Sequence, residues 1–390
     1  MKDNGVVGSV ADAVGIVDEV LAKHPERNGE WIAEAAWEGR TRPWPGLYLG
    51  HQYNPADPSP PPATVPGVRM PDSPEGRLAR AVVGLLGPLE LLNPIRRCLG
   101  LGRGTGTLVT AFGISLNSEC GDTPAFVRSM SEVMAEPPQN PATAGLMPEM
   151  LERIEFLKEQ LPPKYSIALP DLQGPFNLMH AIAGDDALTG PYENPELFER
   201  FMARIADYWL AARGLLMKRI GAARLPFEEL RAARIAECSV NLVSPDTYLK
   251  HILPHDLRIA AEAGRVAVHT CSGPHVFRAT LAHLPVAATE AGRIPCAVAG
   301  YTEVDDALAA LRGTTVLLNV GQELPDDFEE AYQFVLRDFD RYAEHRSMLF
   351  SYTGMQWRVA DRPRMVALHR RLDAVWAERY GATATNSSRH

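Results

Sequence analysis

Long apolar runs and clusters of basic residues are both missing from this sequence. The most apolar window, residues 78–95, is interrupted by Arg80, Pro88, Glu90 and Pro94, so we expect no transmembrane helix. Acidic residues outnumber basic ones by 48 to 39, which gives a net charge of −9. Because a surface of that sign repels nucleic acid and anionic membranes, we expect neither as a partner.

Cysteine is scarce as well. The five cysteines are scattered along the chain and odd in number, which is not the pattern of a disulfide framework. Residues 1–15 lack the apolar core and the basic lead of a secretory signal. Together these two features predict a protein of the reducing cytoplasm.

Several familiar catalytic motifs are also absent. The sequence has no Gly-x-Ser-x-Gly elbow, no P-loop and no His-Glu-x-x-His. Their absence argues against a serine hydrolase, an NTPase and a thermolysin-like protease. No internal repeat is visible either, so a solenoid is not expected.

The sequence does contain a regular alternation of short apolar segments and amphipathic segments after residue 145. We predict strands at residues 165–171, 233–238, 265–270, 286–291, 315–320 and 347–352. We predict helices at residues 147–160, 176–183, 195–220, 245–263, 274–282, 304–311, 326–343 and 362–379. Strands that helices cover on both faces form a parallel sheet. The 390 residues, 46% of them hydrophobic, suffice for one large α/β barrel or two ordinary domains.

The residues that end the predicted strands favour the barrel. They are small or polar, namely Asp171, Gln173, Glu237, Cys238, His269, Cys271, Glu290, Asn319, Gln322, Ser351 and Tyr352. In a (β/α)8 barrel all such ends meet at one face, where active sites lie, whereas an open sheet spreads them along an edge. We therefore predict an α/β fold with a (β/α)8 TIM barrel over residues 76–380. An irregular, proline-rich extension with one helix, residues 1–75, precedes it, and a disordered tail, residues 381–390, follows it.

One strand end carries a histidine and a cysteine. His269 and Cys271 are two residues apart, so their side chains lie on the same side of the strand. Imidazole and thiolate are good zinc ligands. Glu290 ends the next strand, about 5 Å away in a sheet, and Cys296 follows six residues later, so these four residues form a candidate metal set. The spacing alone also fits a hydrogen-bonded histidine beside an inert cysteine, with Glu290 paired to Arg293.

Two other strand ends carry carboxylates. Asp171 and Glu237 are candidate catalytic acids or bases. A Gly-Pro pair follows Asp171 and opens a helix, so capping of that helix is the alternative role for Asp171. The candidate substrate-binding residues are Gln173, Asn241, Asn319, Gln322 and Tyr352.

Three segments, residues 167–205, 244–273 and 314–321, resemble the uroporphyrinogen decarboxylase superfamily. The likeness extends over about residues 100–379 and rests on the order of the segments. It implies a single (β/α)8 barrel with a deep pocket at the carboxyl ends of the strands. The decarboxylases proper carry an Arg-Gln-Ala-Gly-Arg type signature that is missing here, and Gln322 stands where they have a histidine. Porphyrinogen decarboxylation is therefore not expected.

The resemblance is closer to the zinc-dependent methyltransferases that work with corrinoid proteins and thiols. Those enzymes carry His-x-Cys, then an acidic residue one strand later, then a late cysteine. His269, Cys271 and Glu290 match the first three positions, and Ser351 stands near the place of the late cysteine. The resemblance thus implies a zinc site in which either Cys296 is the fourth ligand or the metal has three protein ligands.

The function that this resemblance implies is zinc-dependent methyl (alkyl) transfer. A metal-activated thiolate is the nucleophile, and the methyl group is bound to a thiol or to a corrinoid. This function implies a small-molecule substrate. A corrinoid protein and a second copy of the chain, in a homodimer, are further candidate partners. Two alternatives stay open. One is a metal-free decarboxylase or lyase of a small carboxylate that uses Asp171 or Glu237, and the other is a barrel that binds a corrinoid or tetrapyrrole without catalysis.

Overall fold

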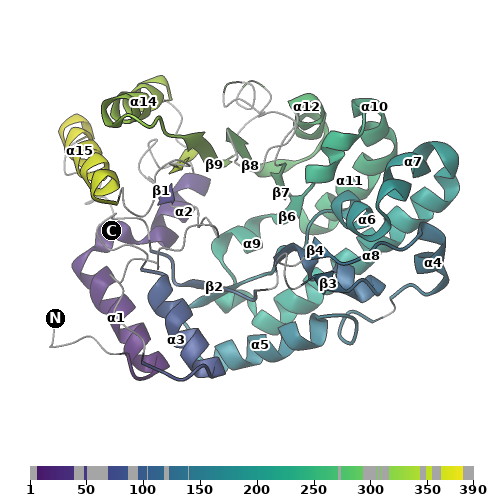
Figure 1. The fold of residues 1–390 in the computed structure, drawn as a ribbon, viewed down its shortest axis with the longest axis horizontal. Helices are drawn as coiled ribbons and strands as arrows, with labels where there is room; N and C mark the ends of the chain where they lie inside the picture. Colours follow the sequence, from purple (N-terminus) through teal and green to yellow (C-terminus); the bar gives the residue numbers. More distant parts are fainter. Residues whose placement is uncertain are drawn as a thin grey trace. The chain divides into compact units, whose positions relative to one another are not determined.

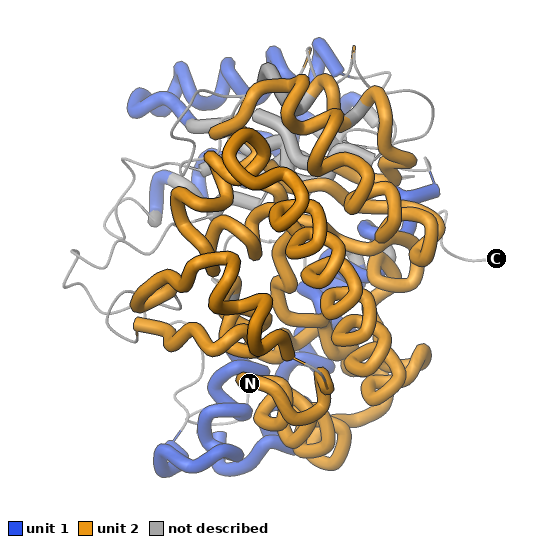
Figure 2. Tube along the Cα trace, turned by 90° about the vertical axis from the view of Figure 1, so that its right-hand side faces the viewer, with its two compact units in different colours: residues 1–97, 316–390 blue, residues 98–315 orange. Residues whose placement is uncertain are grey.

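A computed structural model describes most of the chain, and the fold is shown in Figure 1. The described residues are 7–38, 48–50, 69–86, 95–102, 104–117, 123–138, 140–270, 274–292, 305, 309, 316–342, 348–353 and 362–380. They divide into two compact units, which Figure 2 colours separately. One unit spans residues 98–315, and the other combines residues 1–97 with residues 316–390. The domain boundaries expected from the sequence, at residues 75 and 380, stay predictions.

Short parallel strands form the sheets of the unit 98–315. Strands β6 (Ala233–Ala236), β7 (Val266–His269) and β8 (Val286–Gly292) pair in that order, side by side in Figure 1. β2 (Cys98–Gly100) pairs with β5 (Ser166–Ala168), also in parallel. A small antiparallel pair, β3 (Leu116–Asn117) with β4 (Thr123–Pro124), lies outside these sheets. Parallel neighbours need long crossovers, which helices supply here.

The helices of this unit are α4 (Met130–Ala135), α5 (Met147–Gln160), α6 (Pro175–Ala183), α7 (Asp185–Glu193), α8 (Pro195–Ile220), α9 (Phe227–Arg231), α10 (Pro245–Thr247), α11 (Leu253–Ala263) and α12 (Pro274–His283). The longest, α8, begins at Asn194, whose side chain accepts the Leu197 N–H at 3.2 Å, with a proline at the first position. It ends at Gly221, whose φ is 84°. Between α10 and α11 the chain makes a π-helical turn, Tyr248–Ile252, next to Pro254, which has no N–H for the helical ladder.

The other unit has its own parallel sheet. β1 (Tyr48–Gly50), β10 (Met348–Thr353) and β9 (Val316–Glu323) pair in that order. Its helices are α1 (Val10–Lys23), α2 (Gly29–Trp37), α3 (Pro74–Gly84), α14 (Phe328–Arg341) and α15 (Arg362–Tyr380). Serine side chains cap α1 and α3, since Ser9 and Ser73 accept N–H groups of the first turn at 3.1 Å.

The mixed fold with parallel strands is as predicted, and each of the six strands expected after residue 145 is present. Of the predicted helix 304–311, only residues 305 and 309 are described, and the predicted tail 381–390 lies outside the described residues. The pairings within each unit close no ring among the described strands, so the closed barrel is not confirmed. None of the described helices is long and apolar enough to span a membrane.

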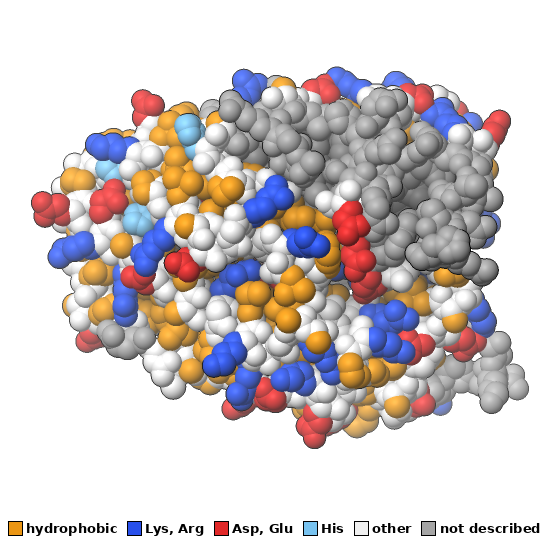
Figure 3. All heavy atoms as spheres, turned by 180° about the vertical axis from the view of Figure 1, so that it is seen from behind, with side chains coloured by type: hydrophobic (Ala, Val, Ile, Leu, Met, Phe, Trp, Pro, Cys, Tyr) orange, Lys and Arg blue, Asp and Glu red, His pale blue; other side chains and the backbone are white. Residues whose placement is uncertain are grey.

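The surface carries side chains of both charge signs. On the face drawn in Figure 3, acidic and basic side chains of the described residues are interspersed with hydrophobic ones.

Candidate functional site

The turn between β5 and α6 is held in an unusual conformation. Gln173 has a φ of 59°, in the left-handed region that non-glycine residues seldom adopt. Two hydrogen bonds hold it there. Its N–H donates to Asp171 Oδ1 at 3.0 Å, and its carbonyl accepts the Trp209 Nε1–H at 2.9 Å. Such strain persists only where the surroundings enforce it, and it concentrates at functional sites.

Glu237, at the end of β6, caps the next helix. Its buried carboxylate accepts the backbone N–H groups of Phe176 and Asn177, each at 3.2 Å, in the first turn of α6. Gly174 lies directly against this carboxylate, because a Cβ at that position would be 2.0 Å from Glu237 Oε1. The Gly174 N–H in turn donates to Ala236 O at 2.8 Å. Hydrogen bonds and close packing therefore join the end of β6 to the start of α6.

A second buried carboxyl group, that of Asp256 on α11, interacts with Glu237. The Tyr248 hydroxyl donates to Asp256 Oδ2 at 3.1 Å. Burial raises the pKa of Asp256 to about 7. Burial first, and then the charge of Asp256, raises the pKa of Glu237 well above its usual range, although the two N–H groups of α6 act in the opposite direction. Two coupled carboxyl groups without access to water share a proton at neutral pH.

A chain of polar side chains extends from the strained turn. The Asn177 amide donates to Gln173 Oε1 at 2.7 Å and its Oδ1 accepts the Ser239 N–H at 2.6 Å. Ser239 Oγ lies 2.9 Å from His180 Nδ1, and burial lowers the pKa of His180. The sequence analysis did not single out Asn177 or Ser239. The Asn241 amide donates to Cys238 O at 3.0 Å, and its predicted role in the pocket stays a prediction.

The backbone register places two of the predicted metal ligands at the same level. β7 and β8 pair Val268 with Thr289, so His269 and Glu290 are the next residues on two neighbouring strands. The His269 carbonyl accepts the Glu237 N–H at 2.8 Å. Cys271 and Cys296 lie outside the described residues, as does the side chain of Glu290. Among the side chains that are described, no three potential ligands gather at one point.

The remaining predicted pocket residues lie in the other unit. β9 and β10 pair Gln322 with Tyr352 at their carboxyl ends, and Asn319 lies earlier on β9. Their side chains are outside the described part of the chain, so their role in substrate binding stays a prediction.

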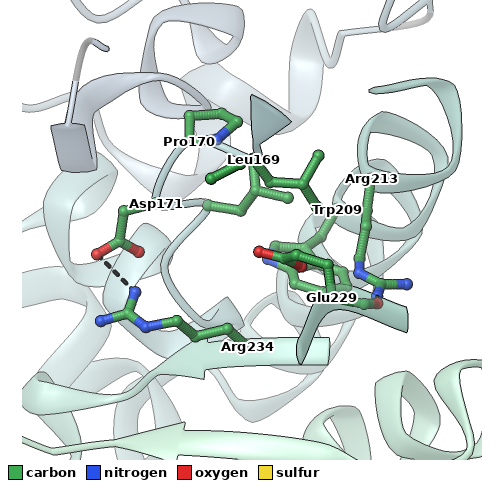
Figure 4. Close-up of a pocket in the computed structure, with 9 residues that line it drawn as sticks. Leu169, Pro170, Asp171, Trp209, Arg213, Glu229 and Arg234 are labelled. Carbon is green, nitrogen blue, oxygen red and sulfur yellow. Dashed lines mark hydrogen bonds and ion pairs between the residues drawn. The ribbon is translucent and has the colours of Figure 1, made fainter. Parts of the chain in front are cut away.

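Asp171 lies in different surroundings from Glu237. Its Oδ2 forms an ion pair with Arg234 Nη1 at 2.8 Å, at the edge of a cavity of about 290 Å³. Figure 4 shows Asp171 and Arg234 on one side of this cavity and Trp209, Glu229 and Arg213 on the other. Burial alone would raise the pKa of Asp171, but the charge and hydrogen bond of Arg234 lower it below its usual value. Asp171 is therefore ionised at neutral pH, which suits a base rather than an acid.

Glu229 in the same cavity provides a test by pH. Burial raises the pKa of Glu229 to about 7. Between the ordinary value of 4.5 and 7 the folded chain binds more protons at this site than the unfolded chain, so stability falls as pH rises through that window. We expect Glu229→Gln to raise the free energy of unfolding by about 2 kcal/mol at pH 8 and to change it little near pH 4.5.

Urea unfolding at the two pH values measures this difference. Glu262→Gln is the matched control, because it removes one negative charge from an exposed position on α11, outside the cavity lining. A Glu229→Gln effect that is the same at both pH values would contradict the raised pKa.

Comparisons with known proteins yield a likeness of fold. No family model matches the sequence, and no curated protein matches it. A methyltransferase from Methanosarcina mazei matches the structure with a TM-score of 0.50 and 14% sequence identity, over 76% of this chain and 85% of that one. A B12-independent methionine synthase from Shewanella sp. W3-18-1 matches with a TM-score of 0.37 and 17% identity, over 58% of this chain and 67% of that one. The fold shared with the first agrees with the resemblance inferred from the sequence.

Proposed function

Starting from a fold shared with a methyltransferase, we propose that this chain is a zinc-dependent methyl (alkyl) transferase. In this proposal zinc would hold a substrate thiol as a thiolate. The methyl group would pass to that sulfur from its carrier, a thiol or a corrinoid, and the carrier would keep the electron pair of the broken bond. One observation carries it: His269 and Glu290 follow the last register pair of β7 and β8, Val268 with Thr289. The backbones of two residues level on neighbouring parallel strands lie about 4.8 Å apart across the sheet, which is a suitable separation for two ligands of one ion.

The donor types suit zinc. His269 supplies an imidazole nitrogen, Cys271 a thiolate and Glu290 a carboxylate, and Cys296 is the candidate for a fourth position. A site with three protein ligands and one exchangeable position is the catalytic type. Zinc bound there would hold a substrate thiol as a thiolate at neutral pH.

The chain's own residues would position this site. The Glu237 N–H holds the His269 carbonyl, and the Glu237 carboxylate holds the start of α6. We therefore assign Glu237 a positioning role, because both of its oxygens are engaged and it is buried. Gln173, beside this helix start, is a candidate to orient the substrate through its amide. Asn319, Gln322 and Tyr352 stay predictions as substrate-binding residues. A closed (β/α)8 barrel, a corrinoid protein and a homodimer belong to the same proposal.

Zinc content tests the proposal directly. Protein purified without added metal should contain about one equivalent of zinc, and Cys271→Ser should lower this to less than about 0.2 equivalents because the thiolate is lost as a ligand. Cys98→Ser, on β2, is the matched control and should leave the zinc content unchanged. Wild-type protein with less than about 0.2 equivalents, or Cys271→Ser with an undiminished content, would overturn the zinc site.

A further inference from the structure

The cavity beside Asp171 has the features of a ligand site that the zinc proposal does not use. Its volume is about 290 Å³, and it lies between residues 168–172, α8, α9 and β6. That volume is at the small end of the range for ligand pockets, which combine apolar walls with a few polar groups. We infer that it binds a small monocarboxylate with an apolar tail, its carboxylate held by Arg213 and Arg234.

Arg213 has an unmet donor at this cavity. Its Nη2 donates to the carbonyls of Glu229 and Ala232 at 3.0 and 3.5 Å, which fixes the guanidinium in place. Its Nε is buried, and no acceptor for it exists in the described part of the chain. A buried donor without an acceptor is costly. The guanidinium that carries it lines the cavity, where a carboxylate would add a charge-assisted hydrogen bond.

The charges of the lining favour an anion. Two guanidinium groups, of Arg213 and Arg234, face two acidic residues. Asp171 is ionised and already engaged by Arg234 and by the Gln173 N–H. The carboxyl group of Glu229 has a pKa of about 7 because of burial, so it carries at most a partial charge at neutral pH. When protonated, Glu229 can donate a hydrogen bond to a ligand oxygen. The positive charge of the two guanidinium groups then exceeds the negative charge of the lining, and an anionic ligand would balance it.

The remaining wall is apolar. Trp209 is fully buried, and its N–H is already bonded to the Gln173 carbonyl. Its ring therefore offers only its apolar surface, to which Leu169 and Leu172 add side-chain carbons. A branched tail of roughly four or five carbons would remain out of water there, and the burial of its apolar surface would favour binding.

Calorimetric titration of the full-length protein tests this assignment with 4-methylpentanoate as the probe. The neutral isostere 4-methylpentanamide and the cation 3-methylbutylammonium are the comparison ligands. We expect the carboxylate to bind at least about tenfold more tightly than either, because only it brings a negative charge to the two guanidinium groups. Equal binding of the amide, tighter binding of the ammonium, or no binding of the carboxylate at about 10 mM would overturn the assignment.

Variants locate the binding in this cavity. Arg234→Gln should weaken the carboxylate by at least about tenfold, and Leu169→Trp, which fills the cavity, should abolish binding even if Arg234→Gln does not fold. Arg231→Gln is the matched control: Arg231 lies on the same helix as Glu229 but stacks on the Phe227 ring at 4.6 Å. An affinity that neither cavity variant changes would place the ligand elsewhere. The zinc content should be the same in all of these variants. A failure of the carboxylate site can therefore be told apart from a failure of the proposed zinc site.

Discussion

Glu237→Ala is expected to lower the free energy of unfolding by about 3 kcal/mol. The substitution leaves the N–H groups of Phe176 and Asn177 without their acceptor inside the protein, and it opens a cavity at a site with 1% exposure. The substitution also leaves Asp256 as a single buried carboxyl group in place of two that share a proton, so the loss is smaller than the cost of two orphaned donors in isolation.

Urea unfolding followed by circular dichroism measures this loss. Glu237→Gln keeps the size and one carbonyl acceptor, so it should cost roughly half as much. Glu262→Ala, an exposed glutamate on α11, is the matched control and should stay within about 0.5 kcal/mol of the wild type. If Glu237→Ala were equally mild, the carboxylate would not be what stabilises the start of α6.

Gly174→Ala should be similarly destabilising, by about 3 kcal/mol. The new methyl group would lie 2.0 Å from Glu237 Oε1 and 2.3 Å from its carboxyl carbon. Glu237 cannot turn away without abandoning the N–H groups of α6, so the turn itself has to shift. Overpacking of this kind usually costs 1–3 kcal/mol, and here the loss of capping adds to it.

Gly214→Ala is the contrasting substitution. Gly214 lies within α8, and a Cβ there meets no atom within 4 Å. Alanine is the better helix former, so this change should raise the free energy of unfolding by about 0.5–1 kcal/mol. Thermal or urea unfolding of both variants gives the comparison, and a Gly174→Ala protein as stable as Gly214→Ala would refute the close packing at the turn.

Local sequence signals found the strands and the long helices after residue 145, but they placed no strand before it, so β1 and β2 were missed. Helix α8 was predicted at its observed bounds, because Asn194-Pro195 starts it and Gly221 ends it. Strands β6, β7 and β8 were found within one or two residues as apolar runs. The pair β3 and β4 was missed, because strands of two residues carry no periodicity.

The contacts of the site could not be found in this way. Glu237 was singled out as a strand end, but its engagement with α6 depends on how the Gly174 turn folds back over β6. Asp256 and Glu229 lie on helices among charged neighbours and read as surface residues. Segments distant in the sequence bury these two carboxyl groups and so raise their pKa values. The local sequence pattern does not predict this burial.

The division of the chain into two units has a consequence for its synthesis. Residues 98–315 are continuous, so this unit can fold as soon as its segment has emerged from the ribosome. The other unit joins the two ends of the chain: Tyr48 on β1 pairs with Ser351 on β10. At about 5–20 residues per second, β1 waits roughly 15–60 s for its partner strand. During translation the unpaired edge of β1 is therefore open to aggregation or to binding by chaperones. A circular permutant that begins near residue 316 would place β10 before β1 in the chain and so remove the delay between their syntheses.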